Sequence, residues 1–177
     1  VVDDMAYAVN TTNAARRALL LTNGNRFLEQ ALATLPGLSV TRAVTPPLEA
    51  QPFDLYVLDR LTMTLPAGAN ALLIGATSLF TTSGTFSDTQ FLRTETHPVT
   101  QQLDWRTINV LNAQRVNAPG WLRPVVEAQG GPLLFAGENS ANVGLQRAVL
   151  LPFELRRSDL PLQIAFKPGP FHREEYL

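Results

Sequence analysis

The chain has 177 residues, of which 45% are hydrophobic and 16% are charged, and its formal net charge is −1. This composition suits one folded domain, and it excludes the basic stripe that nucleic-acid binding requires. The chain has no cysteine, which excludes disulfides, thiolate nucleophiles and cysteine-ligated zinc.

Both ends of the chain differ from its middle. Residues 1–16 end in Thr, Asn and Ala, as a linker or the last strand of an upstream β-rich domain would. The chain begins with Val1 instead of Met, so we expect it to be a piece of a longer protein. Residues 167–177 contain two prolines and a glycine, and we expect a flexible tail. Residues 17–166 are predicted to form one α/β domain.

The domain is predicted to start with a strand, a turn and a helix. Residues 18–21 are all apolar, and the polar turn 22–25 follows them. Apolar residues then recur at the spacing of one helical face until Pro36-Gly37 ends the pattern. These positions are Phe27, Leu28, Ala31, Leu32 and Leu35.

Further short apolar runs predict the remaining strands. Runs at 39–44, 53–60 and 71–76 complete a parallel sheet that is buried on both faces. Later runs at 107–116, 121–138 and 147–155 predict antiparallel additions at one edge, with a hairpin turn at Gly130-Gly131. No apolar run approaches the ~20 residues of a membrane-spanning helix. We therefore predict a Rossmann-like or flavodoxin-like three-layer sandwich with no membrane segment.

The turn Thr22-Asn23-Gly24-Asn25 has two interpretations. Backbone N–H groups between a strand and a helix can bind an anion. Glycine and asparagine are also the residues that a tight turn and a helix cap require. The sequence contains neither the three-glycine dinucleotide fingerprint nor a phosphate-binding loop, and we favour the structural interpretation.

The stretch "IGATSLF" at residues 74–80 resembles the strand-turn that holds the nucleophile in some α/β enzymes. Such an elbow needs small residues two positions before and after the nucleophile. Thr77 and Ser78 are the candidates, but Leu79 and Phe80 stand where small residues are needed. The base would be His97, whose position before Pro98 is more typical of a turn residue.

Carboxylates are dispersed along the chain, and Asp59 is the best single candidate. It ends the run "LYVLD", and ligand crevices in open α/β sheets form outside the carboxyl ends of the strands. A strand-end aspartate that caps the following turn is the structural alternative, which we favour. Two histidines without a nearby carboxylate pair give no metal site, and no cofactor is expected.

Several stretches together resemble a known family. They are "ALLLTNGNRFLEQALATLPGLSVTRA", "FDLYVLDRLTMTLPAGANALLIG", "HPVTQQLDW", "GPLLFAGE" and "RAVLLPFELRRSDLPLQIAF". In this order they look like the C-terminal region of bacterial membrane-anchored proteins that carry a von Willebrand factor A domain. The resemblance covers roughly residues 5–166, and it implies a fold like that of class I glutamine amidotransferases. The tail "KPGPFHREEYL" departs from the family, in which the chain would run toward a membrane helix.

The resemblance also guides the functional hypotheses. Amidotransferases hold a cysteine in the strand-turn that matches "LLIGATSLF", and this chain has none. The first hypothesis is therefore a non-catalytic domain that serves interaction, assembly or regulation in a larger membrane-anchored protein. Its partners would be other domains of that protein or separate proteins, and the resemblance implies a location outside the cytoplasm.

Two alternatives remain. One is a hydrolase that uses Ser78 or Thr77 with His97. The other is a small-molecule binding module at the carboxyl ends of the strands. Its ligand-binding residues would be Asn23, Gly24, Asp59 and Thr77.

Overall fold

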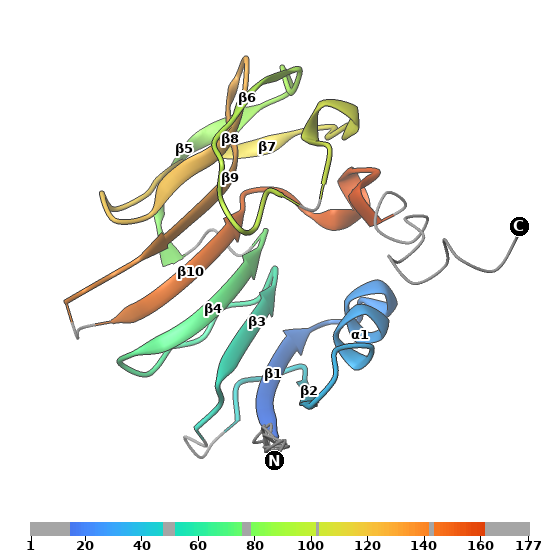
Figure 1. Cartoon of the computed structure of the whole chain (residues 1–177), viewed down its shortest axis with the longest axis vertical. Coiled ribbons are helices and arrows are strands. Elements are labelled where there is room, and N and C mark those ends of the chain that lie inside the picture. The colour runs from blue at the N-terminus through green and yellow to red at the C-terminus, as the bar shows by residue number, and fades with distance from the viewer. Residues whose placement is uncertain (1–14, 48–51, 76–78, 102, 142–143, 162–177) are drawn as a thin grey trace, which may run out of the picture.

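The computed structural model describes residues 15–47, 52–75, 79–101, 103–141 and 144–161. Within these ranges the chain forms an eight-stranded mixed sheet, a two-stranded sheet and one α-helix. The strands of the large sheet follow the order β2-β1-β3-β4-β10-β9-β8-β6 (Figure 1). The chain is therefore an α/β structure dominated by its sheet.

The first five strands of that order run parallel to one another. They are β2 (Leu38–Ala43), β1 (Arg16–Thr22), β3 (Leu55–Asp59), β4 (Ala69–Ile74) and β10 (Leu145–Leu151). The four strands predicted for the parallel sheet, β1 to β4, are confirmed, as is their parallel direction. The run 147–155 was expected among the antiparallel additions, but β10 pairs parallel with β4, and this long-range pairing has no local signal in the sequence. All five carboxyl ends consequently meet at one edge of the sheet, which we call the carboxyl edge.

The remaining strands are antiparallel, as the sequence predicted for one edge. They are β9 (Gly131–Glu138), β8 (Arg123–Ala128) and β6 (Phe91–Thr94), and the predicted turn joins β8 to β9. A separate pair, β5 (Thr81–Phe86) and β7 (Ala113–Asn117), forms the small sheet. The sequence analysis missed β5 and β6, which have few apolar residues to mark them.

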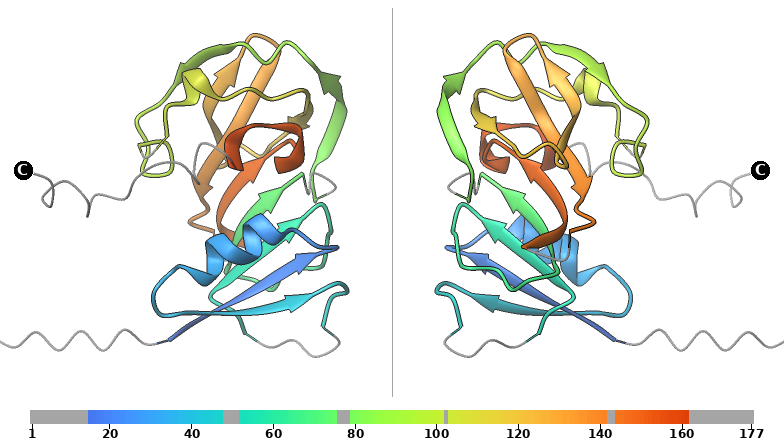
Figure 2. Two further views of the ribbon diagram at one scale, coloured as in Figure 1. Left: turned by 90° about the vertical axis from the view of Figure 1, so that its right-hand side faces the viewer. Right: turned by 90° about the vertical axis from the view of Figure 1, so that its left-hand side faces the viewer.

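Helix α1 (Arg26–Ala33) occupies the predicted position and packs on one face of the parallel strands (Figure 2). Its buried Leu28 and Leu32 belong to the same cluster as Leu20 of β1 and Val57 of β3. Asn25 begins the helix as its N-cap, because its side chain accepts a hydrogen bond from the backbone N–H of Leu28.

The opposite face of the parallel strands is covered without a helix in the described part of the chain. Leu19, Leu21 and Leu58 lie there and are at most 1% exposed. Their cover comes from connecting segments, through partly buried residues such as Leu61 and Met63. The expected burial on both faces is thus correct for β1 and β3, but β2 is an edge strand with exposed positions. A layer of helices on both faces is not seen among the described residues.

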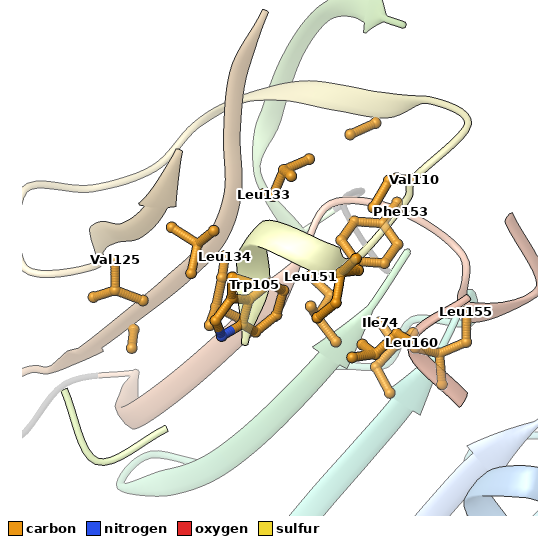
Figure 3. Close-up of a cluster of buried hydrophobic side chains, with 14 of the residues drawn as sticks. Ile74, Trp105, Val110, Val125, Leu133, Leu134, Leu151, Phe153, Leu155 and Leu160 are labelled. Carbon is orange, nitrogen blue, oxygen red and sulfur yellow. The ribbon is translucent and has the colours of Figure 1, made fainter. Parts of the chain in front are cut away.

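The cluster beneath helix α1 continues into the antiparallel part (Figure 3). Trp105, on a short 3-10 helix, packs with Leu134 and Phe153 in one cluster. Two glycines allow close backbone approaches beside it. A Cβ on Gly137 would lie 2.0 Å from the carbonyl oxygen of Trp121, and one on Gly130 would lie 2.5 Å from the ring of Phe86. Any side chain at these positions would force the strands apart.

Candidate functional site

The carboxyl edge brings two buried polar side chains together. Thr22 is the last residue of β1, Asp59 is the last residue of β3, and the two are partners in the parallel register. The Thr22 hydroxyl donates a 2.7 Å hydrogen bond to Oδ2 of Asp59, and both residues are at most 1% exposed. A buried carboxylate is strongly destabilising unless it is paired, so its other partners matter.

Asn25 supplies the second partner and links the carboxylate to helix α1. Its Nδ2 donates to Oδ2 of Asp59 over 3.3 Å, while its Oδ1 caps the helix. The Gly24 N–H donates to the Thr22 hydroxyl at 3.1 Å, and Gly24 has a φ of +114° that favours glycine. The turn 22–25 is therefore fully explained by local structure, which agrees with the structural interpretation of the sequence.

Arg60 is the third partner of the carboxylate and has an unusual backbone conformation. Its φ is +60°, and no other non-glycine residue in the described ranges has a positive φ. This conformation costs about 1 kcal/mol relative to glycine. Its side chain lies 3.5 Å from the buried Asp59 and 3.9 Å from the partly exposed Glu154, and the second of these ion pairs contributes roughly 0–1 kcal/mol.

A cleft of about 220 Å³ opens beside this network, and we call it the carboxyl-edge cleft. It lies where the chain leaves β1 toward β2 on one side and β3 toward β4 on the other. Such a switch point is the general location of ligands in open α/β sheets. Its lining residues are Gly24, Asn25, Phe27, Asp59, Arg60, Glu154, Leu155, Arg156 and Pro161.

A second hollow of about 210 Å³ shares Glu154 with this cleft. Its lining includes Gly75, which directly follows β4 and has a φ of +59°. A Cβ on Gly75 would lie 3.2 Å from Cγ of Arg60 and 3.4 Å from Cγ of Glu154. The absence of a side chain at Gly75 thus leaves room for the Arg60–Glu154 pair between the two hollows.

The structure places only some of the predicted ligand-binding residues in the cleft. Gly24 and Asp59 line the cleft, whereas Asn23 is exposed and is not part of the lining. Thr77 and Ser78 lie outside the described residues. The sequence analysis missed Arg60, Glu154 and Arg156, which lie up to 96 positions apart in sequence. Only the pairing of β4 with β10 brings Glu154 to this edge, and no local pattern predicts that pairing.

His97, the proposed base, follows β6 in a compact turn. Its Nδ1 accepts a 3.3 Å hydrogen bond from the backbone N–H of Val99, and the backbone N–H of His97 donates to the Thr100 hydroxyl. Three strands separate β6 from β4 in the sheet, and β6 runs in the opposite direction to β4. The end of β6 that precedes His97 therefore lies away from the carboxyl edge of β4, which favours a structural role for this residue.

The described side chains offer little acid–base or metal chemistry. No three His, Asp or Glu residues in the described ranges come together as a metal site would require. The pKa of Arg93 is raised by its hydrogen bond to Glu127 and by the charge of that carboxylate, so Arg93 stays protonated. No described helix is long and apolar enough to cross a membrane.

Comparison with models of known protein families finds no match for this chain, and a sequence comparison with curated proteins finds none either. The assignment of function thus depends on the geometry of the carboxyl edge.

Proposed function

We propose that this chain is a non-catalytic α/β domain that binds a small molecule at the carboxyl-edge cleft and thereby regulates a larger protein. The observation that carries the proposal is a cleft at the switch point of the parallel strands, beside a buried carboxylate that accepts two side-chain hydrogen bonds. Asp59 accepts hydrogen bonds from Thr22 and Asn25 and faces the Arg60 guanidinium. These contacts fix the position of the carboxylate, and we assign it a role in shaping the site.

The strand order supports the finer fold that the sequence suggested. Numbered among the parallel strands alone, the order is 2-1-3-4-5, the order of flavodoxin-like folds. We extend this to a class I glutamine amidotransferase-like domain in a membrane-anchored protein with a von Willebrand factor A domain. In that arrangement the domain would lie outside the cytoplasm, and its partners would be other domains of the same chain or separate proteins.

The absence of cysteine supports the non-catalytic assignment, since amidotransferase chemistry needs a thiolate. The alternative, a hydrolase based on Ser78 or Thr77, needs a histidine within hydrogen-bond reach. His97 already accepts a backbone hydrogen bond in the turn after β6, and three strands lie between β6 and β4. We therefore place the binding function ahead of the hydrolase.

Two measurements on the 177-residue chain test the proposal. The first follows hydrolysis of glutamine and of a simple activated ester, with Ser78→Ala as the matched variant. We expect no turnover above that of buffer, and turnover that Ser78→Ala abolishes would overturn the non-catalytic assignment. The second is a thermal-shift screen of small molecules, in which a ligand raises the melting temperature by binding the folded state. A screen without any stabilising compound would overturn the binding function.

A further inference from the structure

The carboxyl-edge cleft is lined by two arginines, Arg60 and Arg156, and by two carboxylates, Asp59 and Glu154. Arg42 reaches the same edge, with its Nη2 3.7 Å from the position of a Cβ on Gly24, but it is paired with Glu29. Asp59 belongs to the lining, but it is buried and already accepts hydrogen bonds from Thr22 and Asn25. Glu154, the remaining carboxylate of the lining, hydrogen-bonds to the guanidinium of Arg156.

Arg60 occupies a backbone position that glycine would fill with less strain, because its φ is +60°. An arginine here brings a guanidinium group to the cleft, which a glycine would not. Its distances to Asp59 and Glu154, 3.5 and 3.9 Å, are longer than the roughly 2.7–2.9 Å of a charge-assisted hydrogen bond. The guanidinium is thus positioned by its two carboxylate neighbours and still has N–H groups to offer a ligand.

Building on the proposed function, we propose that the ligand of this cleft carries a carboxylate or phosphate group, which Arg60 binds through its guanidinium. The planar guanidinium matches both groups because it can donate two parallel hydrogen bonds to their oxygens. Arg156, which is 67% exposed, is paired with Glu154, so Arg60 is the main donor to the ligand. The cleft volume of about 220 Å³ is below the ~300–1,000 Å³ of drug-sized sites, so the ligand is small.

The test compares three probes at constant ionic strength: sodium succinate, sodium phosphate and succinamide. Succinamide has the carbon skeleton of succinate without its charges, and the succinate and phosphate arms separate the two anion classes. Binding is followed by amide chemical shifts and by melting temperature. We expect one anion to bind, to shift Gly24 and Asn25, and to bind more tightly than succinamide.

Variants then locate the contact. Arg60→Gly removes the guanidinium while suiting the positive φ, so the chain should fold and lose at least about tenfold in affinity for the anion. Arg60→Lys keeps the charge without the planar donors, and an intermediate affinity is expected. Arg147→Ala is the matched control, because Arg147 is an exposed arginine opposite Asn70, near the start of β4.

Anion binding that Arg60→Gly leaves unchanged would overturn this proposal, as would a cleft that binds succinamide but neither anion. In the second case the proposed binding function survives and only the ligand class is wrong. Failure of every compound in the wider thermal-shift screen would overturn the binding function itself. The two failures are therefore distinguishable.

Discussion

Strand β3 has an aspartate at each end, and the two residues differ in their exposure to solvent and in their hydrogen-bond partners. Asp54 precedes the strand, is exposed, and accepts a 2.7 Å hydrogen bond from the backbone N–H of Arg17. Asp59 ends the strand, is 1% exposed, and accepts hydrogen bonds from the side chains of Thr22 and Asn25. Both aspartates tie β3 to β1.

The difference between the ends shows what makes the carboxyl edge special. At Asp54 the partner is a backbone group, and water is available to replace the bond if it is lost. At Asp59 the partners are side chains with little access to water, and each would be left unsatisfied without the carboxylate. A cleft opens beside Asp59. We infer that the network at Asp59 fixes the shape of that cleft.

The largest expected effect is that of Asp59→Ala. It removes the acceptor of Thr22 and Asn25 and leaves Arg60 without its nearer carboxylate. We expect the free energy of unfolding to fall by roughly 3 kcal/mol, measured by urea denaturation. A loss below about 1 kcal/mol would show that the network at this end does not stabilise the fold.

Thr22→Val comes next, because it removes one hydroxyl while keeping the shape of the side chain. Asp59 then loses its 2.7 Å hydrogen bond and Gly24 loses the acceptor of its N–H. The expected loss is roughly 1–2 kcal/mol in the same urea experiment. Thr22→Ser keeps the hydroxyl and serves as the control, with a smaller loss from the missing methyl group. Equal losses in both variants would contradict the hydrogen-bond explanation.

A substitution of Asn25 can separate its role as the N-cap of α1 from its hydrogen bond to Asp59. Aspartate and asparagine are equally good N-caps, so Asn25→Asp should be neutral if the residue acts only as the helix cap. In this protein, however, the Asn25→Asp variant would also lose the Nδ2 donor to Asp59 and would place a second carboxylate beside it. We expect Asn25→Asp to lower the melting temperature at neutral pH by the equivalent of about 1 kcal/mol. An unchanged melting temperature would show that Asn25 acts only as the helix cap.

The smallest effect is expected for Asp54→Ala at the opposite end of β3. Its carboxylate is exposed, and water can hydrate the Arg17 N–H once the side chain is gone. The predicted loss is at most about 1 kcal/mol by urea denaturation. A loss as large as that of Asp59→Ala would remove the contrast between the two ends.

The sequence predicted those parts of the fold that depend on local patterns. The apolar runs of β1, β3 and β4 and the helical spacing around Leu28 and Leu32 mark elements that bury their side chains nearby. Asn25 could be identified as a cap because it directly precedes that spacing. Strand β5, with the sequence TTSGTF, is mostly exposed and has no apolar pattern to reveal it.

The candidate site was predictable only in part, for a related reason. Asp59 and Gly24 follow apolar strands directly, so the rule for the carboxyl ends of strands finds them. Glu154 and Arg156 follow β10, and their place in the cleft depends on a pairing between β4 and β10 over long sequence separation. The positive φ of Arg60 is likewise set by tertiary contacts, since its N–H donates to the carbonyl oxygen of Ile74.

The most direct test of the account is a chemical-shift map of the folded chain with a compound that stabilises it in the thermal-shift screen. The account predicts that the largest shifts fall at the carboxyl edge, on Gly24, Asn25 and Arg60, while Asp54 and Asn70 at the opposite edge stay unchanged. Shifts centred on Asp54 and Asn70, with the carboxyl edge unaffected, would contradict it.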